Sequence, residues 1–232
     1  IKYLPELETF EEIVLPGKET FPFTLAVDSK GKIWFGTTGN GKIGNIDPKD
    51  NTVTQILTET ILKGPEALFF DDKGNLWIAE HTGSAIIKFN PILETFERIS
   101  VPGDNVLPFG MTVDRYGNIW FAQHTVDDIG AYDPDNNNLI QIPIPTNSTF
   151  VQFMTSDGDG NIWFVEQQAN KIGTVKITEI PVIASQIQTT NNFELKYTEI
   201  ASPLIALGII ATSLFFVKSI QDKRRLNSMI NS

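Results

Sequence analysis

The stretch GNIWFAQH, residues 117–124, decides the fold because the chain repeats it with small changes. Related stretches are GKIWFGTT at 31–38, GNLWIAEH at 74–81 and GNIWFVEQ at 160–167. The only tryptophans of the chain lie 43 residues apart, and they are Trp34, Trp77, Trp120 and Trp163. Four glycines keep the same spacing, and they are Gly31, Gly74, Gly117 and Gly160. Such a fixed period marks one supersecondary unit that recurs along the chain.

Each unit predicts four β-strands and no helix. In the third unit, FGMTVD, IWFAQH, DIGAYDP and LIQIPIP have strand character, and RYGN forms a tight turn between the first two. An aspartate precedes each tryptophan by six residues, where its side chain can accept hydrogen bonds from the turn backbone, while the glycine adopts a positive φ. Four strands in 43 residues match one blade of a β-propeller. We therefore expect an all-β fold with four blades over residues 18–177 and the tryptophans packed inside them.

The N-terminal segment extends the same pattern. IKYLPELETFEEIVLPG at 1–17 aligns with IKFNPILETFERISVPG at 87–103, a displacement of two repeat lengths. The chain thus begins inside a blade, and it shows neither an initiating methionine nor a secretory signal. We expect further blades upstream, about six or seven in the complete protein. The propeller region is predicted over residues 1–183, and the polar residues 184–199 predict a stalk.

A membrane anchor is predicted after the stalk. The 18 residues from Ile200 to Val217 carry no charge, and as a helix they reach about 27 Å, close to the thickness of a bilayer's hydrocarbon core. The tail, residues 218–232, contains four basic residues and one acidic residue. Since Lys and Arg mark the cytoplasmic flank, we expect a single-pass protein of the cell membrane with the propeller outside and the C-terminus in the cytoplasm. The lipid bilayer is thereby a predicted partner.

Composition excludes several functions. The chain has 28 acidic and 18 basic residues, a net charge of −10, which argues against a nucleic-acid surface because phosphate binding needs clustered Lys and Arg. It contains no cysteine, so disulfides, thiolate metal ligands and a cysteine nucleophile are excluded.

The repeat, seen best in GNIWFVEQQANKIGTV at 160–175, resembles that of the virginiamycin B lyase (streptogramin lyase) propeller family over residues 1–183. The resemblance implies a site at the mouth of a central channel. There, histidines in a PHG or PHA context and glutamates that end WFTE strands hold a magnesium ion and move a proton. Activity of this kind would make the protein a carbon–oxygen lyase.

The matching positions in this chain are only partly kept. Eleven residues before each tryptophan, where the resemblance implies histidine, the chain has Phe23, Glu66, Phe109 and Gln152. Three residues after each tryptophan, where it implies glutamate, the chain has Thr37, Glu80, Gln123 and Glu166. Strand one runs from the mouth to the turn and strand two runs back, so both sets are expected at one end of the blades.

We take Glu66, His81 and His124 as catalytic candidates, and Glu80, Glu166 and His124 as candidate ligands of Mg²⁺, Ca²⁺ or a transition metal. The alternative is a solvated loop face without a cofactor, in which the two histidines point away from the channel because they follow the Glu or Gln position by one residue.

Two functions from different classes follow. The first is a membrane-anchored, extracytoplasmic binding or scaffold module, an accessory subunit of a membrane protein complex, because an anchor raises the effective concentration beside a membrane partner. The alternative is a streptogramin-lyase-like C–O lyase or a lactonase-like metal-dependent enzyme. A separate motif, NST at 147–149, makes Asn147 a candidate N-glycosylation site on the external side.

Overall fold

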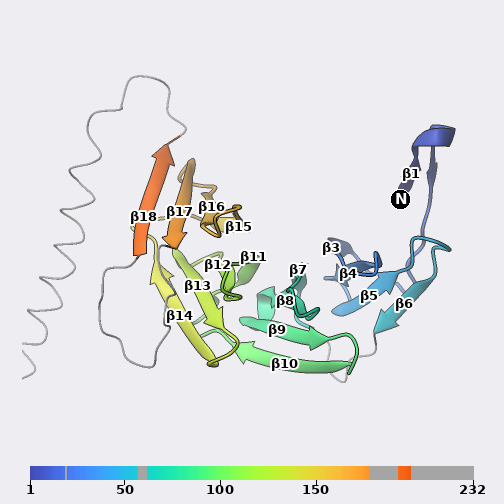
Figure 1. Ribbon diagram of the computed structural model, residues 1–232, viewed down its shortest axis with the longest axis horizontal. Coiled ribbons are helices and arrows are strands. Elements are labelled where there is room, and N and C mark those ends of the chain that lie inside the picture. Colours follow the sequence, from blue (N-terminus) through green and yellow to red (C-terminus); the bar gives the residue numbers. More distant parts are fainter. Residues whose placement is uncertain (19, 57–61, 178–192, 200–232) are drawn as a thin grey trace, which may run out of the picture. The chain divides into compact units, whose positions relative to one another are not determined.

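The computed structural model describes residues 1–18, 20–56, 62–177 and 193–199. Regular structure in these ranges consists of β-strands and two single 3-10 turns, η1 (Pro5–Leu7) and η2 (His81–Gly83). The all-β prediction is therefore confirmed. Strands β3 to β18 form four antiparallel sheets of four strands each, and within each sheet the strands follow chain order (Figure 1). These are the blades that the 43-residue repeat predicts.

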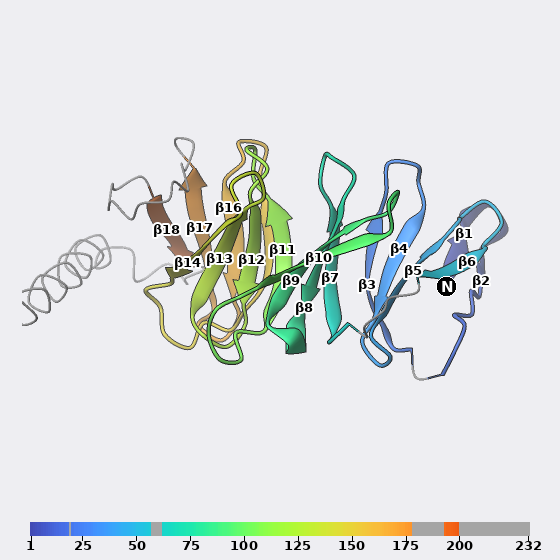
Figure 2. The same ribbon diagram turned by 90° about the horizontal axis from the view of Figure 1, so that it is seen from below.

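The blades are numbered in chain order, and each is a simple up-and-down meander (Figure 2). Blade 1 contains β3 (Pro22–Val27), β4 (Ile33–Thr37), β5 (Lys42–Ile46) and β6 (Val53–Ile56). Blade 2 contains β7 (Pro65–Phe70), β8 (Leu76–Glu80), β9 (Ala85–Asn90) and β10 (Thr95–Ser100). Blade 3 contains β11 (Pro108–Val113), β12 (Ile119–Gln123), β13 (Asp128–Asp133) and β14 (Asn138–Pro143). Blade 4 contains β15 (Val151–Ser156), β16 (Ile162–Glu166), β17 (Lys171–Ile177) and β18 (Phe193–Glu199).

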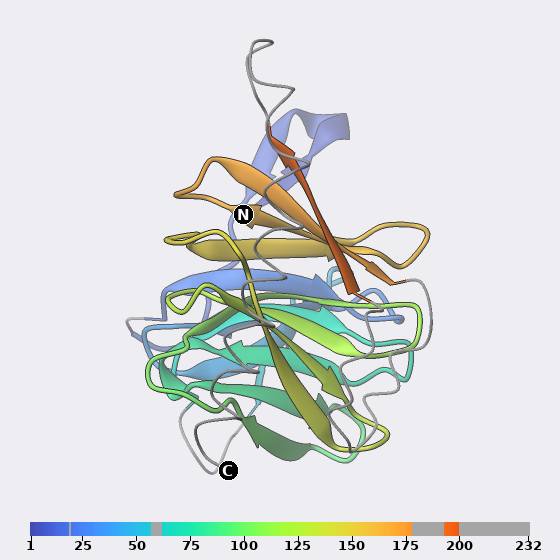
Figure 3. The ribbon, with the colours of Figure 1, turned by 90° about the vertical axis from the view of Figure 1, so that its left-hand side faces the viewer.

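The last strand of blade 4 corrects one sequence prediction. Residues 184–199 were assigned to a stalk, but 193–199 form β18, which pairs beside β17 (Figure 3). The predicted membrane span at 200–217 and the basic tail lie outside the described residues. Within the ranges that the structure describes, no helix is long and apolar enough to cross a membrane.

The N-terminal hairpin repeats the outer half of a blade. Strands β1 (Lys2–Leu4) and β2 (Thr9–Glu11) pair with each other, with Tyr3 opposite Phe10. Glu8 in their turn has φ 46°, and Glu94, in the matching turn of blade 2, has φ 53°. Both residues therefore adopt the left-handed conformation, as the displacement of two repeats predicts.

The turn between strands one and two is built by the repeated aspartate. In blade 3, Oδ1 of Asp114 accepts the backbone N–H groups of Tyr116 and Asn118 at 2.9 and 3.0 Å. The glycine of this turn, Gly117, has φ 86°, a conformation that costs glycine little. Oδ2 of Asp114 accepts the indole N–H of Trp120 at 2.9 Å. The same indole bond recurs in the other blades at 2.8 to 3.0 Å, between Trp34 and Asp28, Trp77 and Asp71, and Trp163 and Asp157.

Neighbouring blades share their cores. The clusters of buried apolar side chains join blade 1 to blade 2, blade 2 to blade 3, and blade 3 to blade 4. Trp77 is fully buried and meets Tyr132 of blade 3 with the ring centroids 6.0 Å apart. Strand one of each blade also contacts strand one of the next, from β3 through β7 and β11 to β15. This contact brings the ends of successive strands together.

Inside three blades, a phenylalanine on strand two covers a glycine on strand three. Phe121 lies opposite Gly130, and a Cβ added to that glycine would fall 2.0 Å from the phenyl ring. Phe35 with Gly44 and Phe164 with Gly173 repeat this arrangement. Blade 2 fills the same space with Ile78 opposite Ile87. The two isoleucines of blade 2 thus fill about the same volume as the phenylalanine and glycine of the other blades.

Candidate functional site

The two histidines lie where strand two ends and strand one begins. His81 follows β8 directly, and His124 follows β12. The backbone N–H of His81 donates to the carbonyl of Gly64 at 2.8 Å, and that of His124 donates to Leu107 at 3.3 Å. Gly64 and Leu107 immediately precede β7 and β11, so each bond fastens the two strand ends together. We call this side of the blades the mouth end.

The structure brings the three catalytic candidates together there. Nε2 of His81 lies 3.3 Å from Nδ1 of His124, although the residues belong to different blades. Nδ1 of His81 lies 3.5 Å from Oε1 of Glu66, and the side chains of this pair are 15% and 17% exposed. These side chains are therefore not those of a solvated loop face, and the direction of the histidines relative to a central channel stays a prediction.

Burial sets the charge of this group. It raises the pKa of Glu66. It lowers the pKa of His81, which the neighbouring His124 lowers further, and it lowers the pKa of His124. Both imidazoles are therefore neutral near pH 7, each with one N–H and one lone pair.

Aromatic side chains surround the histidines. The ring of Phe109 is 5.6 Å from that of His81 and 5.3 Å from that of His124, and both contacts are edge-on. The ring of Phe150 is 3.8 Å from that of His124. Glu66, His81, Phe109, His124 and Phe150 are named the mouth cluster below. Phe109 occupies the position of blade 3 where the resemblance implies a histidine, and its buried ring lies at the centre of the mouth cluster.

Two further phenyl rings extend the apolar surface. Phe23 and Phe153 both stand nearly perpendicular to Phe109, with ring centroids 5.9 and 5.6 Å away. They are 54% and 60% exposed.

The residues three positions after each tryptophan do not join the mouth cluster. Thr37, Glu80, Gln123 and Glu166 are buried inside their blades, at most 2% exposed. Glu80 accepts the backbone N–H of Lys63 at 2.8 Å and pairs with Arg98. Gln123 accepts a hydrogen bond from Gln141 at 2.7 Å. The expectation that this set lines the mouth was wrong, because these side chains point into the blades.

The proposed metal ligands are consequently not brought together. Burial raises the pKa of Glu166, against the opposing charge of Lys171. Glu80 is engaged by Arg98, and only His124 of the three candidates belongs to the mouth cluster. Among the described residues, no group of three or more His, Asp or Glu side chains is arranged to hold a metal ion.

The glycosylation candidate lies in an exposed loop. Asn147 is exposed, between β14 and β15. Thr149, the third residue of its motif, is fully buried. Its hydroxyl and backbone N–H both donate to Oδ1 of Asp127, at 2.8 and 2.7 Å. The threonine therefore has a structural role of its own, and modification of Asn147 stays a prediction.

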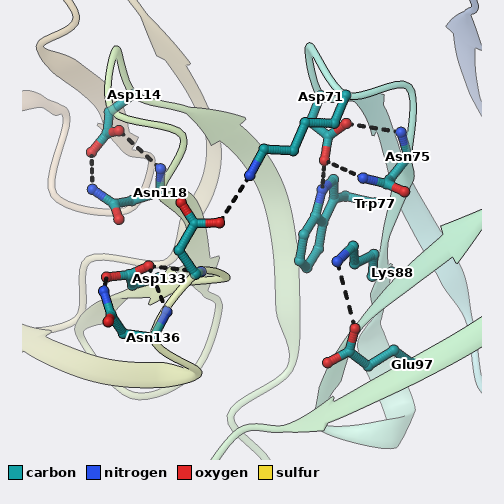
Figure 4. Close-up of polar contacts among 11 residues, drawn as sticks. Asp71, Asn75, Trp77, Lys88, Glu97, Asp114, Asn118, Asp133 and Asn136 are labelled. Carbon is teal, nitrogen blue, oxygen red and sulfur yellow. Dashed lines mark hydrogen bonds and ion pairs between the residues drawn. The ribbon is translucent and has the colours of Figure 1, made fainter.

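No sequence motif indicates the polar cleft at the opposite, turn end of blades 2 and 3. Figure 4 shows polar contacts in this region. The cleft has a volume of about 280 Å³, and Lys73 and Asp135 form an ion pair at 2.9 Å across it. Lys88, which also lines it, pairs with Glu97 at 3.6 Å. Both lysines of the cleft are thus paired, Lys73 across the two blades and Lys88 within blade 2. The mouth-end role of Phe150 was also missed, because an aromatic residue before strand one has no motif.

Comparison with known proteins agrees with this architecture. Residues 8–196 match the sequence pattern of the virginiamycin B lyase family. A streptogramin B lyase structure superposes with a TM-score of 0.71 at 24% identity, over 83% of this chain and 59% of that one. Virginiamycin B lyase from Staphylococcus aureus superposes with a TM-score of 0.69 at 23% identity, over 82% and 59%. A protein described as a putative gluconolactonase superposes with a TM-score of 0.56 at 13% identity, over 68% and 61%.

These likenesses, all below 25% identity, establish the β-propeller fold. The chain spans about 59% of the length of the two lyase structures. No curated protein sequence matches the chain.

Proposed function

The chain belongs to the virginiamycin B lyase family, and from that premise we propose that it works as a binding module, a membrane-anchored propeller outside the cell, and not as a lyase. The observation that carries this proposal is the aromatic character of the mouth end. Phe109, buried between two neutral histidines, and the exposed Phe23 replace two of the histidines that the resemblance implies. Aromatic side chains of this kind supply contact area for a partner and cannot move protons.

The second support comes from the glutamates. Proton abstraction beside an ester requires a positioned base together with a cation or hydrogen-bond donors for the developing charge. Glu80 is held by Arg98 and by the N–H of Lys63, and Glu166 is fully buried. Both carboxylates lie buried inside their blades and do not belong to the mouth cluster.

The predicted anchor at 200–217 places this binding face beside a membrane, where a tethered module gains effective concentration toward a membrane-protein partner. Topology is tested by adding protease to intact cells that express the full chain with a C-terminal tag. The propeller should be degraded and the tag protected. A tag that protease removes from intact cells would reverse the orientation and exclude an external propeller.

The decisive functional test is incubation of the purified full chain with a streptogramin B antibiotic and magnesium, followed by mass spectrometry. We expect no ring opening. Partner binding is tested by photo-crosslinking from position 23 in native membranes, with position 30, in the exposed turn at the opposite end of blade 1, as control. Crosslinks to a membrane protein from position 23 alone would support the module.

One observation favours the alternative, an acid–base enzyme. Glu66, His81 and His124 form a line of contacts in which a carboxylate orients an imidazole, as in many catalytic sites. Magnesium-dependent turnover of the antibiotic that disappears in Glu66→Gln would establish this alternative and refute the binding module.

A further inference from the structure

The four ring nitrogens of the two histidines differ in their surroundings. Nε2 of His81 and Nδ1 of His124 share one contact at 3.3 Å, so one nitrogen donates and the other accepts. Nδ1 of His81 is buried and makes no hydrogen bond with a described residue, and Oε1 of Glu66 lies 3.5 Å from it. A neutral imidazole has a single N–H. Whichever nitrogen of His81 carries the N–H, the other carries a lone pair, so the atom that faces Glu66 also decides the direction of the contact between His81 and His124.

The carboxylate decides this direction. An ionised carboxylate only accepts hydrogen bonds, so it attracts an N–H and repels a lone pair, even at 3.5 Å. Nδ1 of His81 therefore carries the hydrogen and points it at Glu66. Nε2 of His81 then accepts from the Nδ1–H of His124. The lone pair of His124 is left on its Nε2.

This last nitrogen has no partner. Nε2 of His124 is buried and makes no hydrogen bond with any described residue. A buried acceptor without a donor destabilises the folded state. The ring of Phe150 packs against His124 at 3.8 Å. Phe150 lies in the connection before β15 with φ 51°, a left-handed conformation that is strained for a large side chain. Its ring can turn away without breaking a strand pair.

From these contacts we infer that the mouth cluster binds a neutral ligand that joins an aromatic ring to an O–H or N–H donor. The donor bonds to Nε2 of His124, and the ring packs against the exposed Phe23 and Phe153. An anionic ligand is disfavoured because it would bring a second negative charge near the half-buried Glu66. This inference rests on the proposed binding function and names the chemistry that the binding face recognises.

The tautomers are tested first, by long-range ¹H–¹⁵N NMR of the imidazole rings in the full chain at about pH 8, where unperturbed histidine is neutral. The chain has only two histidines, so two ring systems are observed. Both should be Nδ1–H tautomers, and Glu66→Leu should release His81 from that form. Two Nε2–H tautomers would overturn the inference.

The ligand class is tested with phenol and, as its match without a donor, toluene. Phenol should bind about two- to tenfold more tightly, the ratio that one net hydrogen bond provides, and should shift the Nε2 resonance of His124. His124→Phe keeps an aromatic ring but has no nitrogen, so it should abolish the preference. Gln167→Ala, at the equivalent position of blade 4, should preserve it.

Equal affinity for phenol and toluene, or a preference that survives in His124→Phe, would overturn the inference. These results leave the proposed function untouched, because the crosslinking and antibiotic assays do not depend on the ring tautomers. Ring opening of the antibiotic would refute the binding module and leave the tautomer measurement unaffected.

Discussion

The two ends of the blades carry opposite kinds of residues. At the turn end, all four blades have the same aspartate, glycine and tryptophan, and every aspartate bonds its tryptophan. At the mouth end, the residue directly after strand two varies between blades. It is Thr38, His81, His124 and Gln167 in blades 1 to 4. The repeat is thus strict where a hairpin must close and variable where side chains face a ligand. Folding and function are separated along the strands.

The largest expected effect comes from breaking the turn end. Trp77→Ala removes a fully buried indole and leaves Asp71 without its bond, so we expect the free energy of unfolding to fall by about 3–5 kcal/mol. Urea unfolding followed by circular dichroism measures it. Trp163→Ala is the control, because Trp163 is only partly buried and should cost less. Equal losses would show that the indole bond, and not the packing, dominates.

The next effect tests the phenylalanine–glycine pair. Gly130→Ala places a methyl group against the ring of Phe121, and overpacking of this kind costs about 1–3 kcal/mol. The double change Phe121→Ile with Gly130→Ile copies Ile78 and Ile87 of blade 2 and should recover part of the stability lost by Gly130→Ile alone. The unfolding free energies of the wild type, Phe121→Ile, Gly130→Ile and the double variant form a double-mutant cycle. Strict additivity would contradict the direct contact.

Sequence reasoning reached the blades because their signal recurs with a constant spacing, and it reached Glu66, His81 and His124 because strand direction places them at one end. It failed for Glu80 because side-chain direction at a strand's last residue depends on local twist. It also missed β18, although FELKYTE alternates apolar and polar residues as strands do. The part played by Phe150 could not be foreseen, since nothing in a phenylalanine indicates a left-handed backbone.

Acid should weaken the turn end through Asp157. Hydrogen bonds from Trp163 and Asn161 lower the pKa of this aspartate from 3.8 to about 2 in the folded protein. Its contribution to stability is therefore complete above about pH 4 and is lost as the pH falls toward 2. The urea midpoint should drop less between these values in Asp157→Asn than in the wild type. Parallel pH profiles would show that the aspartate is not linked to folding.

The smallest effect distinguishes backbone strain from packing at the mouth end. Phe21 has φ 43° and is 64% exposed, so its ring adds little stability while its backbone conformation is unfavourable. Asparagine tolerates this conformation far better, and Phe21→Asn should stabilise the protein by about 0.5 kcal/mol. The control is Phe23→Asn, because Phe23 is 54% exposed but lies within strand β3, where asparagine is disfavoured. Urea midpoints should therefore move in opposite directions for two identical substitutions only two residues apart. A shift of the same sign in both variants would mean that side-chain exposure alone decides the effect of these substitutions on stability. The left-handed residues before strand one, including Phe150, would then carry no backbone strain that a ligand could release.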